Sequence, residues 1–281
     1  MDLAAPATVS AGRSATGDGL ASRSGAGEQR ARYLEILLYQ AYCQLRLESE
    51  RLYVGYLWWP LETVLEMGVL YLIFHAILGS SVEHYLSFLL IGLVSWRWLA
   101  QSLTRAAPSI LQNQPLAMQV FVPKLIFPSA MLIGDLVRFG CGLVVLLVFL
   151  RFEGFSASPA LAVFPFVLAV QFLLIAALSL WLAALVPLLR SILVGLDVAL
   201  RFGMFASGVF FDLSRIAEPL RGWLLLNPMA VLLDAWRAVL MEQRRPDPGP
   251  LLVIAACSVV AIVAARLFVR RRELLYPRLP A

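Results

Sequence analysis

From residue 54 onward the chain alternates between long apolar runs and short polar segments. Six runs stand out, at roughly Val54–Leu78, Tyr85–Arg105, Lys124–Leu150, Pro159–Leu188, Ser191–Phe211 and Pro250–Leu267. A helix that crosses a bilayer needs about 20 mostly apolar residues. The pattern therefore predicts an all-α integral membrane protein with six transmembrane helices, which together form a transmembrane domain over residues 53–272.

The segments before and after this domain have different patterns. Residues 1–29 are rich in Ala, Gly and Ser without apolar periodicity, which predicts a disordered cytoplasmic tail. Residues 30–52 place several apolar side chains on one helical face: Leu34, Leu37, Leu38, Ala41 and Leu45. This favours an amphipathic helix in the membrane interface over a surface helix of a small domain. Residues 273–281 are expected to form a second cytoplasmic tail.

The connection 212–249 between the fifth and sixth runs is too charged to cross a membrane. Ser214 or Asp212 is a candidate cap for a first short helix, and Asn227 followed by Pro228 is typical of the start of a second. Apolar residues then recur at helical spacing: Met229, Leu232, Leu233, Trp236, Val239 and Leu240. We expect a re-entrant helical hairpin on the extracytoplasmic side, because irregular backbone at membrane depth needs protein or a polar cavity around it.

Composition and charge agree with a membrane protein. Hydrophobic residues make up 60% of the 281 residues and charged residues only 15%, against about 25% charged in a typical soluble domain. The net charge of +5 comes from cations at the ends of the runs, without the basic stripe that nucleic-acid binding needs. The cations Arg105, Lys124, Arg190 and Arg266 lie at ends of runs that the positive-inside rule places in the cytoplasm. Both termini are therefore expected to be cytoplasmic.

The chain lacks the residues for ATP hydrolysis. A phosphate-binding loop needs Gly-x-x-x-x-Gly-Lys, and the only lysine, Lys124, follows a proline. If transport is driven by ATP, ATP and Mg²⁺ must bind to a separate subunit, so this chain is expected to be no enzyme and to hold no cofactor. Three scattered cysteines, Cys43, Cys141 and Cys257, predict neither a disulfide framework nor a metal site.

Three segments carry a resemblance to a known family. They are Arg51–Glu62 before and within the first run, Asn113–Pro128 before the third, and Ser207–Phe211 together with Asn227-Pro228 and Arg237. In order and spacing they resemble the membrane subunit of ABC type-2 exporters of the O-antigen and capsule class. Thr63 and Ser95 stand where the family often has proline, which concerns local helix geometry more than function.

The resemblance implies an assembly and a cargo. It implies a homodimer in the bacterial inner membrane, joined to two copies of an ATPase, that exports a polysaccharide on a polyprenyl-diphosphate lipid. The hairpin 212–249, with Asn227, Pro228 and Arg237, would gate the extracytoplasmic exit. Capsule or teichoic-acid export stays open as an alternative cargo. A secondary transporter or channel would show internal repeats, and a membrane-embedded enzyme would show a cluster of His, Asp or Cys; neither pattern is present.

The cytoplasmic loop 105–124 is the candidate for coupling to the ATPase. Its prolines and polar residues interrupt helicity between two runs, and apolar residues there would otherwise be exposed, which favours docking over a simple loop. The candidate coupling residues are Asn113, Leu116, Met118, Val120, Phe121, Pro123 and Lys124.

Charged residues inside the runs are candidates for a polar pathway, since each is costly in a bilayer. Asp135 and Arg138 are three residues apart and Asp197 and Arg201 four apart, so each pair shares a helix face and can neutralise itself. Glu62 and Glu66 share a face with no cation at matching spacing. One interpretation is contact with the diphosphate through Arg138 or Arg201; the other is structural pairing near the membrane edges.

Aromatic residues gather at the ends of the runs, where interfacial belts are the usual explanation. A second hypothesis is that some line a channel and stack on sugar rings, so that a polymer slides past. The candidates for this role are Trp58, Trp59, Phe205, Phe210 and Phe211.

Overall fold

The computed structural model describes residues 35–46, 55–73, 84–114, 123–155, 158–212 and 226–272, together with 222 and 224. All regular structure in these residues is helical, which confirms the all-α prediction for the described part of the chain. The predicted tails, 1–29 and 273–281, lie outside the described residues.

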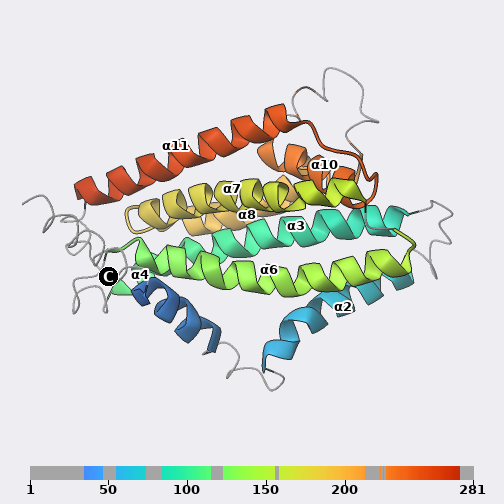
Figure 1. Cartoon of the computed structure of the whole chain (residues 1–281). Helices are drawn as coiled ribbons and strands as arrows, with labels where there is room; N and C mark the ends of the chain where they lie inside the picture. Colours follow the sequence, from blue (N-terminus) through green and yellow to red (C-terminus); the bar gives the residue numbers. More distant parts are fainter. Residues whose placement is uncertain are drawn as a thin grey trace, which may run out of the picture.

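Four long helices form the body of the molecule (Figure 1). They are α3 (Tyr85–Ala106), α6 (Ile126–Phe152), α7 (Phe164–Leu185, preceded by the 3-10 turn η3, Pro159–Val163) and α11 (Pro248–Arg272). Within the described residues, these are the helices long and apolar enough to cross a membrane. Helix α7 packs against α11 and α3, and α3 packs against α6. Helices α3, α7 and α11 run in one direction and α6 runs antiparallel to them (Figure 1).

Two further helices correspond to the first and fifth predicted spans, and both are shorter. Helix α2 (Trp58–Tyr71) has 14 residues and α8 (Ile192–Ala206) has 15. At 1.5 Å per residue these lengths fall short of a hydrocarbon core of about 30 Å. Residues 74–83, which follow α2, lie outside the described residues. A count of six spans therefore stays a prediction.

The predicted end of the fifth span at Phe211 was wrong, because α8 ends at Ala206. The chain turns out of the helix at Ser207, and Gly208 takes a φ of 72°, in the left-handed region that glycine adopts without strain. Residues Phe210 and Phe211 are apolar and continue the run in the sequence, but they belong to a turn.

Helix α10 (Pro228–Leu240) begins where the sequence predicted. The Asn227 side chain accepts a hydrogen bond from the Met229 amide at 3.0 Å, and Pro228 is the first helical residue. The predicted apolar face of α10 is buried against α3, α7 and η3. The first arm of the predicted hairpin, residues 213–221, lies outside the described residues, so the re-entrant hairpin stays a prediction.

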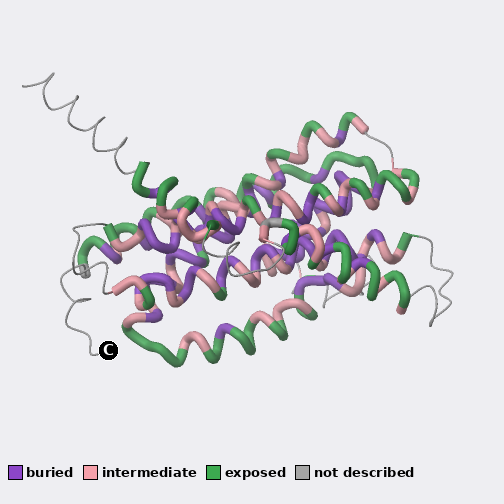
Figure 2. The backbone as a smooth tube through the Cα atoms, turned by 90° about the horizontal axis from the view of Figure 1, so that it is seen from below, coloured by how far each residue is buried: buried purple, intermediate pink, exposed green. Residues whose placement is uncertain are grey.

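A polar link crosses the aromatic centre of the bundle. The Gln171 amide of α7 donates to the Ser95 carbonyl of α3 at 3.0 Å and accepts from the Trp236 indole of α10. Phe139 of α6 contacts both Trp98 and Trp236, at ring distances of 4.1 and 6.2 Å. These contacts fix α10 against α3, α6 and α7, and Figure 2 shows that buried residues gather where the helices meet.

Residues 35–46 form a helical segment that packs on the first half of α6. Leu37 and Ala41 are buried against Ile126 and Ala130, in agreement with the predicted apolar face. Leu38, which the sequence placed on the same face, is exposed. Interface location stays a prediction, but the segment has a protein partner in α6.

Candidate functional site

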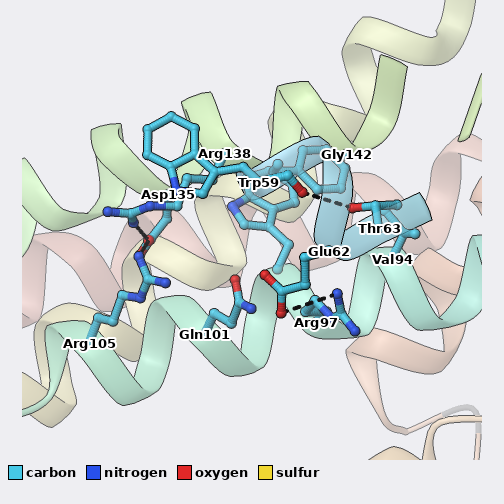
Figure 3. A pocket seen from close by; sticks show the side chains of 12 residues that line it. Trp59, Glu62, Thr63, Val94, Arg97, Gln101, Arg105, Asp135, Arg138 and Gly142 are labelled. Atoms are coloured by element: carbon cyan, nitrogen blue, oxygen red, sulfur yellow. Dashed lines mark hydrogen bonds and ion pairs between the residues drawn. The ribbon is translucent and has the colours of Figure 1, made fainter. Parts of the chain in front are cut away.

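Six charged side chains meet between α2, α3 and α6. We call them the charged cluster: Glu62, Glu66, Arg97, Arg105, Asp135 and Arg138. All of them except Glu66 line a small cavity of about 50 Å³, which is also bordered by Trp59, Thr63, Gln101 and Gly142 (Figure 3). Glu66 joins the cluster through its ion pair with Arg97, so three acids face three bases between these helices.

The first part of the cluster joins α2 to α3. Arg97 of α3 forms ion pairs with Glu66 and with Glu62, the latter at 3.6 Å. The sequence had offered no cation for these two carboxylates, because their partner is on another helix. The pairing neutralises one of the two acidic charges and leaves this half with a local balance of −1.

The second part joins α3 to α6 around Asp135, whose side chain is only 2% exposed. Arg138 forms an ion pair with Asp135, as the three-residue spacing predicted, and Arg105 of α3 binds the same carboxylate oxygen at 3.3 Å. The Arg138 guanidinium also lies 5.4 Å from the Trp59 ring. Two cations share one carboxylate here, so this half carries a local balance of +1.

The residues that sequence reasoning missed are Arg97 and Gln101, and Arg105 was read only as a topology signal. All three follow one face of α3 at spacings of four residues. A polar stripe with this period inside an apolar run marks a helix face turned toward other polar groups. That signal was available in the sequence, and it matches the acidic spacing of Glu62 and Glu66 on α2.

A second polar group holds the turn that follows α8. Arg237 of α10, almost fully buried, donates to the carbonyls of Gly208 and Val209, each at 2.9 Å. Its guanidinium lies 3.4 Å from the centre of the Phe88 ring of α3. We call this arrangement the Arg237 clamp. It satisfies two carbonyls of the turn after α8 that would otherwise be buried without hydrogen-bond partners.

Asn227 strengthens the same junction. Its side-chain amide donates to the Ser207 hydroxyl at 2.8 Å and to the Ala206 carbonyl at 3.3 Å, while its oxygen caps α10. The Tyr85 hydroxyl donates to the Phe210 carbonyl at 3.0 Å. Three segments that are separate in the sequence thus form one connected structure: the start of α3 with Tyr85, the turn after α8, and α10.

The aromatic candidates do not gather at one place. Phe205 and Phe210 stack at 5.2 Å beside the turn after α8, and Phe211 is half-buried next to them in the chain. Trp58 and Trp59 belong to α2, where Trp58 is exposed and Trp59 is buried beside Arg138. A role of these residues along a channel stays a prediction.

Asp197 and Arg201 lie on an open face of α8. Both belong to the described residues, and the structure forms no ion pair between them. They share a shallow groove with Val194, Val198, Phe202 and Phe205. The predicted self-neutralisation of this pair is therefore absent in the single chain.

The coupling candidates are only partly described. The Asn113 side chain donates to the Ser109 carbonyl at 2.8 Å and closes the short helix α4 (Ser109–Gln112). Pro123 is exposed and Lys124 is half-buried just before α6. The remaining four, Leu116, Met118, Val120 and Phe121, lie outside the described residues. Within the described residues, no group of His, Cys, Asp and Glu has the arrangement of a metal site.

Comparison with known proteins found relatives over most of the chain. The O-antigen export system permease protein RfbA of Myxococcus xanthus is 30% identical over 244 residues, which is 86% of this chain and 94% of the relative. Two Klebsiella pneumoniae proteins of the same name are 24% and 25% identical, over 70% and 67% of this chain and 77% and 73% of their own lengths. A search against protein-family models gave no match.

Proposed function

This chain belongs to the family of O-antigen export permeases, and from that premise we propose that it is the membrane half of an ATP-driven exporter of lipid-linked polysaccharide. The observation that carries the proposal is the match over 94% of the length of the Myxococcus relative. The exporter is a homodimer in the bacterial inner membrane, with both termini cytoplasmic and two ATPase subunits bound on that side. The cargo is a polysaccharide attached to polyprenyl diphosphate.

A separate ATPase is supported by the sequence itself. The chain has no phosphate-binding loop, so it needs a partner if export consumes ATP. The ATPase docks at the loop 105–124 and at the N-terminal helical segment, whose residues Leu37 and Ala41 pack on Ile126 and Ala130 at the start of α6. Arg105 belongs both to the start of this loop and to the charged cluster, so docking motions at the loop reach the cluster directly.

The diphosphate of the cargo fits the basic half of the charged cluster. Arg105 and Arg138 share one carboxylate, and guanidinium groups bind phosphate oxygens in pairs of hydrogen bonds. The negatively charged headgroup is attracted to the end of the cluster with Arg105 and Arg138, while Glu62 and Glu66 repel it from the other end. The cluster thereby gives the headgroup one preferred position next to α6.

The test is deletion of the gene in its native host, followed by analysis of cell-surface and lipid-linked polysaccharide. We expect loss of the surface polymer and accumulation of the lipid-linked form inside, both reversed by a plasmid-borne copy. Affinity purification of the tagged chain in mild detergent is expected to recover an ATPase with a phosphate-binding loop. Unchanged surface polysaccharide, or recovery of the chain without any ATPase across several detergents, would reject the proposal.

A further inference from the structure

Helix α11 runs along one outer edge of the bundle and has an inner and an outer side of different character (Figure 1). On the inner side Ala265 and Val269 are buried, and the Trp181 indole of α7 donates to the Ala261 carbonyl at 3.0 Å. This packing fixes the rotation of α11 about its axis. It therefore also fixes which side chains of α11 point away from the protein.

A single row of exposed residues follows the outer side of α11 at alternating spacings of four and three, which keeps the row on one helix face. The row is apolar at first and then becomes basic. We call it the α11 stripe: Leu252, Ala256, Val259, Val263, Arg266 and Arg270. Arg271, also exposed, adds a third cation beside the basic end.

The stripe changes from apolar to basic at the depth of the lipid headgroups. Residues 248–265 carry no charge, and at 1.5 Å per residue they span about 27 Å, close to a hydrocarbon core of about 30 Å. With α11 across the membrane, Arg266 lies at the edge of the hydrocarbon and Arg270 lies one turn further out. Both guanidinium groups are therefore at the level of lipid phosphates.

The charges at this end of α11 are not neutralised by the protein. Arg266, Arg270 and Arg271 form no ion pair with any residue that the structure describes. Arg105, on the same side of the bundle, differs because Asp135 binds it. The positive-inside rule accounts for cations on this side of the membrane, but it does not account for their alignment with an exposed apolar row. That alignment suits a ligand with apolar chains and a negatively charged head.

We propose that the α11 stripe binds an anionic phospholipid from the leaflet on the basic side of the bundle. Its acyl chains lie along Val259 and Val263, and its phosphate binds Arg266 and Arg270. Guanidinium groups form paired hydrogen bonds with phosphate oxygens, and their apolar stems pack along the helix. The site belongs to a membrane lipid and is independent of the cargo. An acidic protein surface is the weaker occupant, because it covers only the basic end and leaves the apolar row unexplained.

The test measures which lipid lies beside the basic end of the stripe. The purified full-length protein, with Cys43, Cys141 and Cys257 replaced by Ser or Ala, carries a bimane label at Leu267→Cys. It is placed in nanodiscs of equal parts phosphatidylglycerol and phosphatidylcholine. One lipid at a time is brominated near its headgroup, since bromine quenches bimane only at short range.

We expect brominated phosphatidylglycerol to quench the label at Leu267→Cys about twofold more than brominated phosphatidylcholine, because arginines near the surface attract anionic lipid. The matched control is a label at Val253→Cys, which is exposed near the other end of α11. There the two lipids should quench equally. Equal quenching at both positions would overturn the proposal.

Charge variants then test the two arginines. R266Q/R270Q is expected to lower the quenching ratio at position 267 to about one, whereas R266K/R270K keeps the charges and should keep the ratio above one. The matched control R151Q/R245Q removes two exposed arginines from the opposite end of the bundle and should leave the ratio unchanged. All of these side chains are exposed, so the variants should elute normally in detergent, which is measured alongside.

Two further results would reject the lipid site. An unchanged ratio in R266Q/R270Q would show that the arginines do not bind the lipid. Equal quenching by both lipids in the unsubstituted protein, together with loss of a co-purifying ATPase from R266Q/R270Q, would assign the basic end to a protein partner. The quenching ratio is read on purified protein without polysaccharide, so it is judged separately from export.

Discussion

Asp135 is a carboxylate that apolar helices hold only because two guanidinium groups accompany it. Arg105 and Arg138 bind the same oxygen from different helices, so the acid links α3 to α6. A buried pair is weak evidence of net stabilisation, but its disruption leaves an uncompensated charge. Asp135 is therefore the residue of the charged cluster that tolerates substitution least.

Asp135→Asn removes this charge without a change of size, and both arginines lose their shared partner. We expect a loss of about 3–5 kcal/mol in stability, the range for removal of one member of a buried ion pair. The measurement is the melting temperature of the purified protein in detergent. Glu62→Gln is the control, since Glu62 is 46% exposed and lies 3.6 Å from Arg97, and exposed pairs contribute at most about 1 kcal/mol. Equal melting temperatures for the two variants would contradict this account.

The pairs that sequence reasoning found were those within one helix. Asp135 and Arg138 are neighbours on the same turn, so spacing alone predicted their contact. Arg97 was missed because its partners are on α2, and helical periodicity says nothing about which faces of two helices meet. The same limit explains Asp197 and Arg201, whose spacing suggested pairing within α8 although both side chains point to an open surface.

At the scale of elements, the junction of α3, α8 and α10 depends on small residues. A side chain at Gly92 of α3 would lie 2.9 Å from the Arg237 guanidinium and 3.2 Å from the Val209 carbonyl. Gly92→Ala is therefore expected to displace the turn after α8 and to cost about 1–3 kcal/mol, the range for overpacking. Gly140→Ala on α6 has no atom within 4 Å and is the matched control.

The control Gly140→Ala should leave the free energy of unfolding unchanged or raise it by up to about 1 kcal/mol, because alanine favours helix more than glycine does. Both variants are compared by melting temperature and by surface polysaccharide in the deletion strain. A destabilised Gly140→Ala together with a normal Gly92→Ala would show that the junction is not closely packed.

Arg237→Lys tests the clamp itself. The guanidinium donates to two successive carbonyls from two separate nitrogens, whereas the single ammonium nitrogen of lysine is a compact point charge that cannot occupy both donor positions. We expect a loss of about 1.5–3 kcal/mol, as for one hydrogen bond from a charged group. A cysteine at Phe210 should then react faster with a water-soluble maleimide. Arg244→Lys, at an exposed pair with Glu242, should change neither value.

The start of α10 was predictable and the end of α8 was not, for a physical reason. Asn227 followed by Pro228 is a local signal, since the cap bond and the fixed φ of proline involve only adjacent residues. The end of α8 depends on Arg237, which is far along the chain and supplies the donors that make a turn at Gly208 favourable. The apolar residues Phe210 and Phe211 gave no local indication that the helix ends before them.

At the scale of the whole molecule, hydropathy alone predicted the order of the long helices and which of their ends lie on the same side of the bundle. The ends of α3, α7 and α11 and the start of α6 lie together in Figure 1, beside the segment 35–46. Arg105, Lys124, Arg190 and Arg266 belong to these ends or lie near them, and the positive-inside rule therefore predicts that this side is cytoplasmic. The crossing of the membrane by α2 and α8 is not decided by their lengths.

Cysteine labelling of intact cells tests the crossing by α8. With the native cysteines replaced, single cysteines are placed at Asn113 and Arg190 on the basic side and at Glu153 and Gln243 on the opposite side. If α8 crosses, an impermeant maleimide added to cells with a permeabilised outer membrane should label positions 153 and 243 only. Positions 113 and 190 should react only after lysis. Because α8 lies between positions 190 and 243, labelling of both from outside would show that it does not cross. Protection of 243 together with 190 would show the same with the opposite placement, and either result would reduce the span count and move the exposed side of α8 out of the bilayer.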